Sequence, residues 1–284
     1  MNILLTGADG FIGRHVHAQL KAAGHATRLL SRQHGCDFAT MTDPRQWLPW
    51  ITGLDAVINC VGIFAATRRY TFDRIHTDAP VALFQACAEC GIPRVLQVSA
   101  LGAESHAPTP FLRSKGRADA FLQMLPLKWM VLRPSLVVGI GGASSHLMCQ
   151  LSRLPLILIP GDGKQVIQPV HVEDVALAVL HALEVKPACR VVAAVGLVRY
   201  TLMDWLNVLR QAQGMGSARF CRLPLSLVRV GCRLGQGLHP LIQEDALDML
   251  QAGSISDIQS FAELLGGLPR SPLQALFKSA GAPT

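Results

Sequence analysis

The residues with the clearest chemical potential form a glycine-rich turn, Thr6-Gly7-Ala8-Asp9-Gly10-Phe11-Ile12-Gly13. The turn follows an expected β-strand and opens an expected helix. Glycines permit a tight turn and close backbone approach, so amide N–H groups and the positive end of the helix dipole can hold an anion. The turn therefore predicts a site for the pyrophosphate of a dinucleotide. The residues expected to bind it are Gly7, Asp9, Gly10, Phe11, Ile12 and Gly13.

The end of the next expected strand indicates which dinucleotide would bind. An NAD site commonly carries a carboxylate about 20 residues after the glycines, where it bonds the ribose hydroxyls. This sequence has Ser31 and Arg32 there and no acid. Because a guanidinium pairs well with a phosphate, Arg32 predicts NADP(H) in preference to NAD(H). A solvated arginine at a strand end is the alternative interpretation.

These residues need elements to position them, and the first 200 residues supply a suitable pattern. Short apolar segments alternate with helical ones, which is typical of a doubly wound parallel α/β sheet, the Rossmann architecture. The expected strands are Asn2–Thr6, Ala26–Ser31, Ala56–Cys60, Arg94–Ser99, Trp129–Leu132 and Arg190–Val195. The expected helices are Phe11–Ala23, Asp78–Cys90, Gly116–Met124 and Val172–Leu183.

Beyond residue 200 the pattern is mostly helical and less regular. The expected helices are Thr201–Gln213, Leu225–Leu234 and Ile242–Gln251. We therefore expect an NADP(H)-binding domain over residues 1–200, in which segment 140–165 dips toward a second lobe. Residues 201–284 would form that smaller lobe, which would serve a substrate or partner.

Composition limits the class of ligand and the location. The chain has 284 residues, with 26 Lys and Arg against 19 Asp and Glu, a net charge of +7. Basic residues do not form long runs, and Arg68-Arg69 is the densest pair, which favours an anionic small ligand over a nucleic acid. No apolar run is long enough to cross a membrane, and the glycine turn follows the first residues too closely for a secretion signal. We expect a cytoplasmic protein.

The cysteines indicate neither a disulfide framework nor a metal site. Eight cysteines are dilute in a chain of 284 residues, so most are expected to be small buried apolar residues. The pair Cys87 and Cys90 has metal-ligand spacing, but it has neither a second such pair nor a nearby histidine pair. We expect no metal.

Several motifs together resemble the extended and atypical short-chain dehydrogenase/reductases, whose members include epimerase- and dehydratase-like proteins. The Gly-x-x-Gly-x-x-Gly spacing is similar to theirs, and Phe111-Leu112-Arg113-Ser114-Lys115 occupies the Tyr-x-x-x-Lys position. Segments 94–103, 133–135 and 169–176 resemble the fifth strand with its active-site loop, the sixth strand, and the start of a late helix. The chain is most similar to the atypical branch that includes the nucleotide-binding accessory subunit of respiratory complex I and its bacterial relatives.

The resemblance implies further cofactor-binding residues. Asp37-Phe38 would end a third strand beside the adenine, and Cys60, Val61 and Gly62 would line the cofactor after the next strand. Pro134 would belong to the strand whose loop covers the nicotinamide. Lys115 would donate to the nicotinamide-ribose hydroxyls. Strand packing explains Cys60 and Val61 equally well, and a surface role remains the alternative for Lys115.

The sequence departs from the family at the catalytic positions. Phe111 replaces the tyrosine that transfers a proton, and Ala100 replaces the hydroxyl that orients the substrate. His76 stands where the family has an asparagine. Ser99 and His76 are therefore candidate catalytic replacements beside Lys115, although a serine at a strand end often bonds local backbone.

Two functional classes remain, and the missing tyrosine favours the first. It is an NADP(H)-binding protein in which the cofactor stabilises the fold or reports redox state to a protein partner. The alternative is an NADPH-dependent oxidoreductase for a carbonyl or quinone, in which water, His76 or Ser99 replaces the phenol. A nucleotide-sugar epimerase or dehydratase is a weaker alternative, because that chemistry needs the missing acid/base.

The expected second lobe carries a group of arginines interleaved with apolar residues. They are Arg219, Arg222, Arg229 and Arg233. Such a pattern could form a basic amphipathic surface for a membrane or a partner. A helix with its arginines on the solvent-exposed face is the favoured interpretation.

Overall fold

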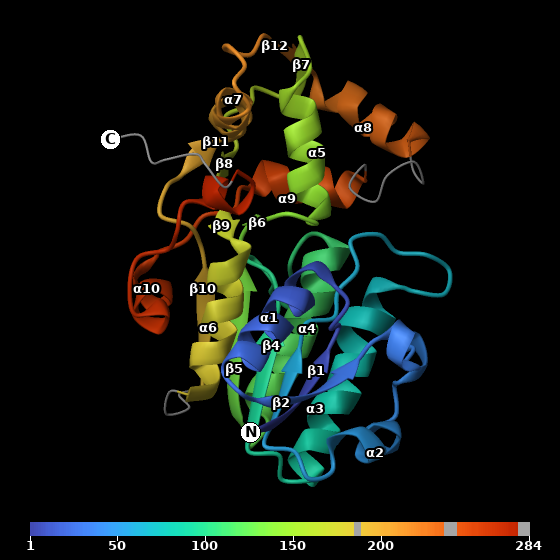
Figure 1. Ribbon diagram of the computed structural model, residues 1–284. Coiled ribbons are helices and arrows are strands. Elements are labelled where there is room, and N and C mark those ends of the chain that lie inside the picture. The colour runs from blue at the N-terminus through green and yellow to red at the C-terminus, as the bar shows by residue number, and fades with distance from the viewer. Residues whose placement is uncertain (185–188, 236–242, 278–284) are drawn as a thin grey trace. The chain divides into compact units, whose positions relative to one another are not determined.

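A six-stranded parallel sheet is the largest sheet of the structure, a computed structural model that describes residues 1–184, 189–235 and 243–277 (Figure 1). Neighbouring strands pair in the order β2-β1-β3-β4-β5-β10, all in parallel. The strands are β1 (Asn2–Thr6), β2 (Ala26–Leu30), β3 (Ala56–Asn59), β4 (Arg94–Val98), β5 (Lys128–Pro134) and β10 (Arg190–Ala194). The predicted Rossmann-like α/β fold is confirmed, and each expected strand is present within two residues.

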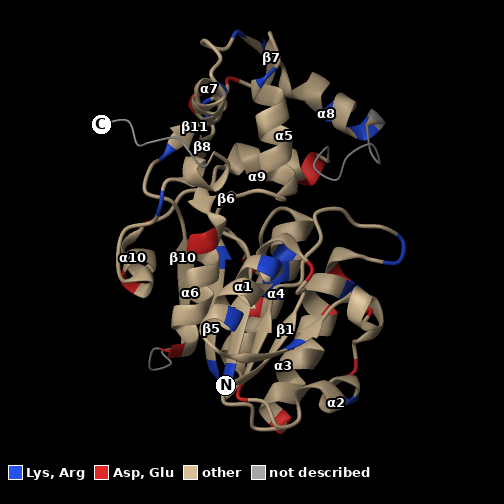
Figure 2. Cartoon of the chain, in the orientation of Figure 1, with Lys and Arg blue, Asp and Glu red and all other residues tan. Residues whose placement is uncertain are grey.

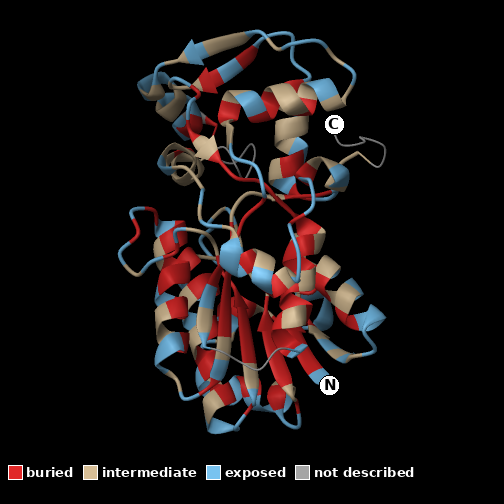
Figure 3. Cartoon of the chain, turned by 90° about the vertical axis from the view of Figure 1, so that its left-hand side faces the viewer, coloured by how far each residue is buried: buried red, intermediate tan, exposed pale blue. Residues whose placement is uncertain are grey.

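Helices cover both faces of this sheet, so its central strands are almost wholly buried (Figure 3). One face packs Leu4, Val57 and Val95 against Leu83 and Leu122. The helices of this part of the chain are α1 (Phe11–Ala22), α2 (Leu48–Ile51), α3 (Ala79–Glu89), α4 (Pro110–Met124), α6 (Val172–Glu184) and α10 (Gln259–Leu265). The chain passes from β1 to β2 on one side and then to β3 on the other. Ligands of such sheets bind where the order reverses, here outside the carboxyl ends of β1 and β3.

Helix α4 begins six residues before the expected start at Gly116. Thr109 caps it by accepting a hydrogen bond from Leu112 N at 3.3 Å, and Pro110 occupies the first turn. Because of this earlier start, Phe111 and Lys115 lie on the helix, four residues apart on one face.

The segment after β2 is not the strand that the resemblance implied for Asp37-Phe38. Short helices replace it: η1 (Arg32–His34), η2 (Phe38–Thr40) and η3 (Pro44–Trp47). The Asp37 carboxylate caps η2 by accepting from Ala39 N at 3.1 Å. A side chain that bonds its own backbone favours a turn over a strand. β2 is therefore the edge strand of the sheet.

The chain divides into two compact units that interleave along the sequence. Unit 1 comprises residues 1–134, 173–194 and 259–267, and unit 2 comprises residues 135–172, 195–258 and the segment from Leu268 onward. A single boundary at residue 200 does not describe this division, because the expected first domain contributes residues 135–172 to unit 2. A short C-terminal segment, α10, conversely belongs to unit 1.

The described residues of unit 2 form helices and three small two-stranded sheets. Its elements are β6 (Val137–Val138), α5 (Ala143–Ser152), β7 (Ile157–Pro160), β8 (Val166–Ile167), β9 (Val170–His171), β11 (Tyr200–Thr201), α7 (Leu202–Ala212), β12 (Phe220–Leu223), α8 (Leu225–Leu234), α9 (Glu244–Ala252) and η5 (Pro272–Ala275). Ile242, the expected start of the last long helix, lies outside the described residues.

Helix α8 exposes apolar side chains as well as arginines. Arg229 and Arg233 bond Asp248 and Glu244 of α9, whereas Leu227 and Val230 are 59% and 51% exposed. The side chains of Arg229 and Arg233 are 41% and 68% exposed, as the favoured interpretation expects, but Leu227 and Val230 share the exposed surface. No helix in the described part of the chain is long and apolar enough to span a membrane.

Candidate cofactor site

The glycine turn is packed tightly against itself and against the end of β3. Gly7 has a φ of +70°, and a Cβ there would lie 2.8 Å from the carbonyl carbon of Cys60. A Cβ on Gly13 would lie 2.1 Å from the Gly7 oxygen. The turn's own backbone therefore requires both glycines, whatever ligand it holds.

Gly10 has a different role from the other two glycines. It is the exposed N-cap of α1 and donates from its N to Gly7 O at 2.9 Å. Since glycine has no side chain to cap the amides of Phe11, Ile12 and Gly13, the first turn of this twelve-residue helix is open to an external anion. This arrangement fits a pyrophosphate.

Asp9 connects the turn to the end of β2. Its carboxylate accepts a short hydrogen bond from Ser31 Oγ, which also lies 2.8 Å from His34 Nδ1. Ser31 therefore positions the turn through Asp9. Arg32 follows as an exposed residue on η1, and its Cζ lies 5.6 Å from the centre of the Tyr70 ring.

A buried polar chain joins the carboxyl ends of three neighbouring strands. Thr6 Oγ1 donates to Asn59 Oδ1 at 2.6 Å, and Asn59 Nδ2 donates to Gln97 Oε1 at 2.7 Å. Asn59 Oδ1 also accepts from Val61 N at 3.2 Å. The chain thus holds the backbone at residues 60–62, where Cys60, Val61 and Gly62 were expected to line the cofactor. Thr6 and Gln97 were not among the predicted site residues. Polar residues at the ends of otherwise apolar strands were a signal that could have identified them.

Lys115 is buried, with only 5% of its surface exposed. Its Nζ donates to Val98 O at 3.3 Å, and a Cβ on Gly62 would lie 3.5 Å from it. Burial lowers the pKa of Lys115 from its ordinary 10.5 to about 8, against the opposing effect of Asp119 and Cys60. Among the described residues Val98 O is its one hydrogen-bond acceptor, so an ammonium with three donors has capacity for a ligand.

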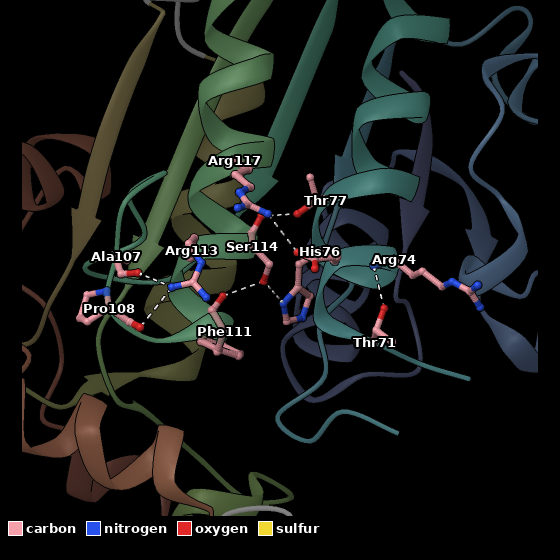
Figure 4. A network of polar contacts seen from close by, with 11 residues as sticks. Thr71, Arg74, His76, Thr77, Ala107, Pro108, Phe111, Arg113, Ser114 and Arg117 are labelled. Carbon is pink, nitrogen blue, oxygen red and sulfur yellow. Dashed lines mark hydrogen bonds and ion pairs between the residues drawn. The ribbon is translucent and has the colours of Figure 1, made fainter. Parts of the chain in front are cut away.

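His76 is bonded through both ring nitrogens, and Figure 4 shows its bond to Ser114. Its Nε2 accepts from Ile63 N at 3.0 Å, so the proton lies on Nδ1, which donates to Ser114 Oγ at 3.1 Å. Ser114 Oγ in turn donates to Phe111 O at 2.9 Å. Burial, with a smaller effect from Lys115, lowers the pKa of His76 well below its ordinary value. The ring is neutral and positions the loop after β3 against α4.

The π-helical segment η4 (Asp73–Asp78) carries His76 and leads into α3, where a single helix was expected from Asp78. A π-helical turn widens the backbone and is often found at functional sites. Here it brings His76 to α4 and to the loop after β3.

Phe111 lies in an aromatic cluster. Its ring stacks on Phe64 at 5.6 Å and meets the rings of Phe72 and His76 edge-on at 5.8 and 5.2 Å. Phe111 is 5% exposed, whereas Phe64 is 56% exposed. Position 111 thus carries an apolar ring with no proton to transfer.

Ser99 is engaged in a second buried network. Its Oγ donates to Asp119 Oδ2 at 2.8 Å, and Arg133 Nε donates to the same oxygen at 3.1 Å. Asp119 is fully buried, and burial raises its pKa although Ser99 and Arg133 act in the opposite direction. Because the Ser99 hydroxyl already serves a carboxylate, its use as a proton donor would require breaking this bond. Neither Asp119 nor Arg133 was identified as part of this network from the sequence.

Most of the expected site residues therefore fall into two groups within unit 1. Gly7, Cys60, Gly62, His76 and Lys115 meet around the carboxyl ends of β1 and β3. Ser31, Arg32, Asp37 and Phe38 lie beyond β2, where Arg69 and Tyr70 join them. Pro134 ends β5 and accepts from Leu101 N at 2.8 Å.

Burial raises the pKa of the Cys60 thiol to about 12, so this group is not a thiolate nucleophile. Within the described residues, no group of three or more His, Cys, Asp or Glu side chains could hold a metal ion. The site's chemistry rests on the glycine turn, Lys115 and the polar groups around them.

Residues 3–193 match the model of the NAD dependent epimerase/dehydratase family. The chain belongs to this family. Family membership agrees with the glycine turn, the parallel sheet and the resemblance derived from the motifs.

Relatives of this family member include subunits of a respiratory enzyme. The chain is 32% identical to the mitochondrial NADH dehydrogenase [ubiquinone] 1 alpha subcomplex subunit 9 of Arabidopsis thaliana over 63% of its length, and spans 49% of that protein. It is 28% identical to the mouse subunit of the same name, with 89% of this chain and 71% of that protein covered. A ceramide reductase of Caulobacter vibrioides is 26% identical, with 78% of this chain and 73% of the relative covered.

Solved structures of similar fold hold a dinucleotide. MoeE5 in complex with UDP-glucuronic acid and NAD superposes with a TM-score of 0.72 at 17% identity, covering 97% of this chain and 96% of that one. The UDP-glucose 4-epimerase of Thermus thermophilus, in complex with NAD, gives 0.62 at 20% identity, covering 79% and 86%. At such identities these likenesses establish the fold.

Proposed function

We propose that this protein binds NADP(H) and uses it in a structural or redox-sensing role rather than in ordinary short-chain dehydrogenase turnover. The observation that carries the proposal is the pairing of Lys115 with Phe111. The buried ammonium keeps donors for a ligand, but the neighbouring phenyl ring has no hydroxyl. The chain can therefore hold a cofactor where it lacks the family's proton donor.

The residues present fit a nicotinamide dinucleotide in several places. The open first turn of α1 would hold the pyrophosphate, Asp37 and Phe38 would lie on the adenine side, and Lys115 would donate to ribose hydroxyls. Arg32 would pair with a 2′-phosphate. When bound, the nicotinamide supplies or accepts a hydride; the chain's residues bind and orient it.

The preference for NADPH is tested by titrating both reduced cofactors and following their fluorescence. A charge-assisted pair with a phosphate supports roughly a tenfold to hundredfold preference. Arg32→Asp should invert that preference, since a carboxylate repels the phosphate and bonds the ribose hydroxyl. Arg45→Asp makes the same charge change on exposed η3 and should leave it intact. Equal affinity of the unchanged protein for NADPH and NADH would overturn the assignment.

A protein partner would receive the redox signal in this proposal. Support comes from the relatives in Arabidopsis and mouse, which are named as subunits. The exposed Leu227 and Val230 on α8 offer apolar surface for contact. Copurification in the presence of NADPH, in the presence of NADP⁺ and without cofactor would test this role. A partner that is retained equally with the reduced and the oxidised cofactor would contradict it.

A second candidate function is an NADPH-dependent reductase for an apolar carbonyl or quinone. The relative named as a ceramide reductase favours it, as does the exposed Phe64 ring stacked on Phe111. Since His76 and Ser99 are both engaged, water is the proton donor that fits best. An epimerase or dehydratase remains a weaker alternative.

Steady-state NADPH oxidation with carbonyls, quinones and sugar nucleotides separates these functions. We expect slow turnover, because a positioned general acid typically contributes about 10² to 10⁴ in rate. Phe111→Tyr should restore part of the missing rate, and Phe111→Tyr with Ala100→Ser should restore more of it. Rapid turnover by the unchanged chain that Lys115→Met abolishes would establish a reductase and contradict the binding role.

A further inference from the structure

Two guanidinium groups from distant parts of the sequence meet at one tyrosine ring. Arg32 belongs to η1, and Arg69 lies in the loop after β3, whose two adjacent arginines are among the basic residues coloured in Figure 2. Their Cζ atoms each lie 5.6 Å from the centre of the Tyr70 ring. The ring attracts both cations, so one aromatic side chain lies beside two positively charged groups.

Asp37 offsets part of this positive charge. Its Oδ2 accepts a short hydrogen bond from Arg69 Nη2, while its Oδ1 accepts from Ala39 N at 3.1 Å. With two guanidiniums and one carboxylate, the cluster has a side-chain charge of one positive unit. Arg32 has no carboxylate partner among the described residues. The cluster therefore has an excess of cationic donors that suits an anion.

Arg69 is able to exchange its partner. Its side chain is 66% exposed, against 23% for Asp37. An exposed ion pair contributes little to stability because water screens it. A phosphate, with more charge and several acceptor oxygens, competes well for a planar guanidinium.

We propose that Arg69 is a second specificity residue of this site, which together with Arg32 binds the 2′-phosphate of NADP(H) across the Tyr70 ring. The inference rests on the proposed binding of NADP(H). Arg69 reaches the adenine side through the loop after β3, which His76 anchors through Ile63 N. The cofactor's phosphate would thereby connect η1 with that loop.

Titration of Arg69→Ala with NADPH and NADH tests the proposal, and the adjacent Arg68→Ala is the matched control. Arg68 is exposed and carries the same charge, so screening and net charge change equally. We expect Arg69→Ala to weaken NADPH binding about tenfold with NADH affinity kept within twofold. Arg68→Ala should change neither by more than twofold. Equal losses in the two variants would reduce the effect to overall charge and overturn the proposal.

A double variant separates direct binding from neutralisation of Asp37. If Arg69 merely cancelled that carboxylate, Asp37→Asn in the Arg69→Ala background would restore NADPH affinity fully. If Arg69 binds the phosphate, as we expect, the double variant remains several-fold weaker than Asp37→Asn alone. Arg69→Gln provides the same comparison should the alanine variant fail to fold.

The outcomes also distinguish this inference from the function on which it rests. A protein with no preference for NADPH would refute the cofactor assignment itself. A clear preference that Arg32→Asp inverts and Arg69→Ala leaves intact would refute the role of Arg69 alone. Adenosine 2′,5′-bisphosphate and AMP, used as competing probes, should repeat the pattern, because they differ only in the 2′-phosphate and lack nicotinamide.

Discussion

Lys115 combines a charged side chain with almost complete burial, and this combination has a free-energy consequence. Its pKa falls from 10.5 to about 8 because burial disfavours the ammonium. Such a shift corresponds to about 3 kcal/mol of lost stability when the group is charged in both the folded and unfolded chains. A group retained at that cost fits a binding role better than a structural one.

Replacing Lys115 should therefore raise stability in a pH-dependent way. At pH 7 we expect Lys115→Met to unfold with a free energy up to about 3 kcal/mol greater than the unchanged protein. Above pH 8 the folded lysine loses its proton while the unfolded one keeps it until about 10.5, so the unchanged protein gains stability and the difference narrows. Urea denaturation at pH 7, 8.5 and 10 measures this, with the exposed Lys128→Met as control. A difference that widens with pH would contradict the shift.

At the scale of elements, α4 gathers four residues of the candidate site on one face. Phe111, Ser114, Lys115 and Asp119 follow helical spacing, and all are buried. Gly116 lets the loop from β4 approach closely, since a Cβ there would lie 2.2 Å from the Glu104 carbonyl carbon. The placement of Lys115 thus depends on a glycine beside it.

Gly116→Ala should destabilise the protein by about 1 to 3 kcal/mol, the usual cost of overpacking. Gly231→Ala is the matched control, because Gly231 also lies in a helix but meets no atom within 4 Å of an added Cβ. There alanine should be neutral or stabilise by up to about 1 kcal/mol. Thermal unfolding gives the melting temperatures of both variants. Similar melting temperatures would contradict the prediction, because they would show that the loop from β4 moves aside at little cost in stability.

At the scale of the whole chain, unit 1 is completed by a segment far beyond its sheet strands. Helix α10 packs beside β10, with Phe261 fully buried, and His181 Nδ1 lies 2.9 Å from Leu264 O. The cofactor-binding unit therefore depends on residues that follow most of unit 2 in sequence.

Phe261→Ala should lower the free energy of unfolding by about 3 to 5 kcal/mol, because it leaves a cavity in unit 1. Leu268→Ala, at a side chain 70% exposed, should change it by less than about 0.5 kcal/mol.

A chain ending at residue 200 should consequently lack a cooperative unfolding transition. Cooperative thermal unfolding of that shorter chain, with NADPH binding retained, would show that α10 is dispensable.

Local patterns in the sequence were sufficient for much of the fold. The six sheet strands and the glycine turn depend on short apolar runs and on neighbouring residues, so their positions followed from the chain alone. The helix that carries Phe111 and Lys115 was expected to begin only at Gly116, so their place on one helix face was not predicted. The Thr109-Pro110 start of α4 was a local signal too, but it was overlooked.

Long-range packing decided the remaining features of the site. The bonds of His76 to Ile63 and Ser114, and those of Ser99 and Arg133 to Asp119, join residues whose proximity depends on how whole elements pack. The same holds for Arg32 and Arg69, which meet at Tyr70. Sequence spacing determines neighbours within one strand, helix or turn, whereas contacts between loops are set by the tertiary fold that carries them.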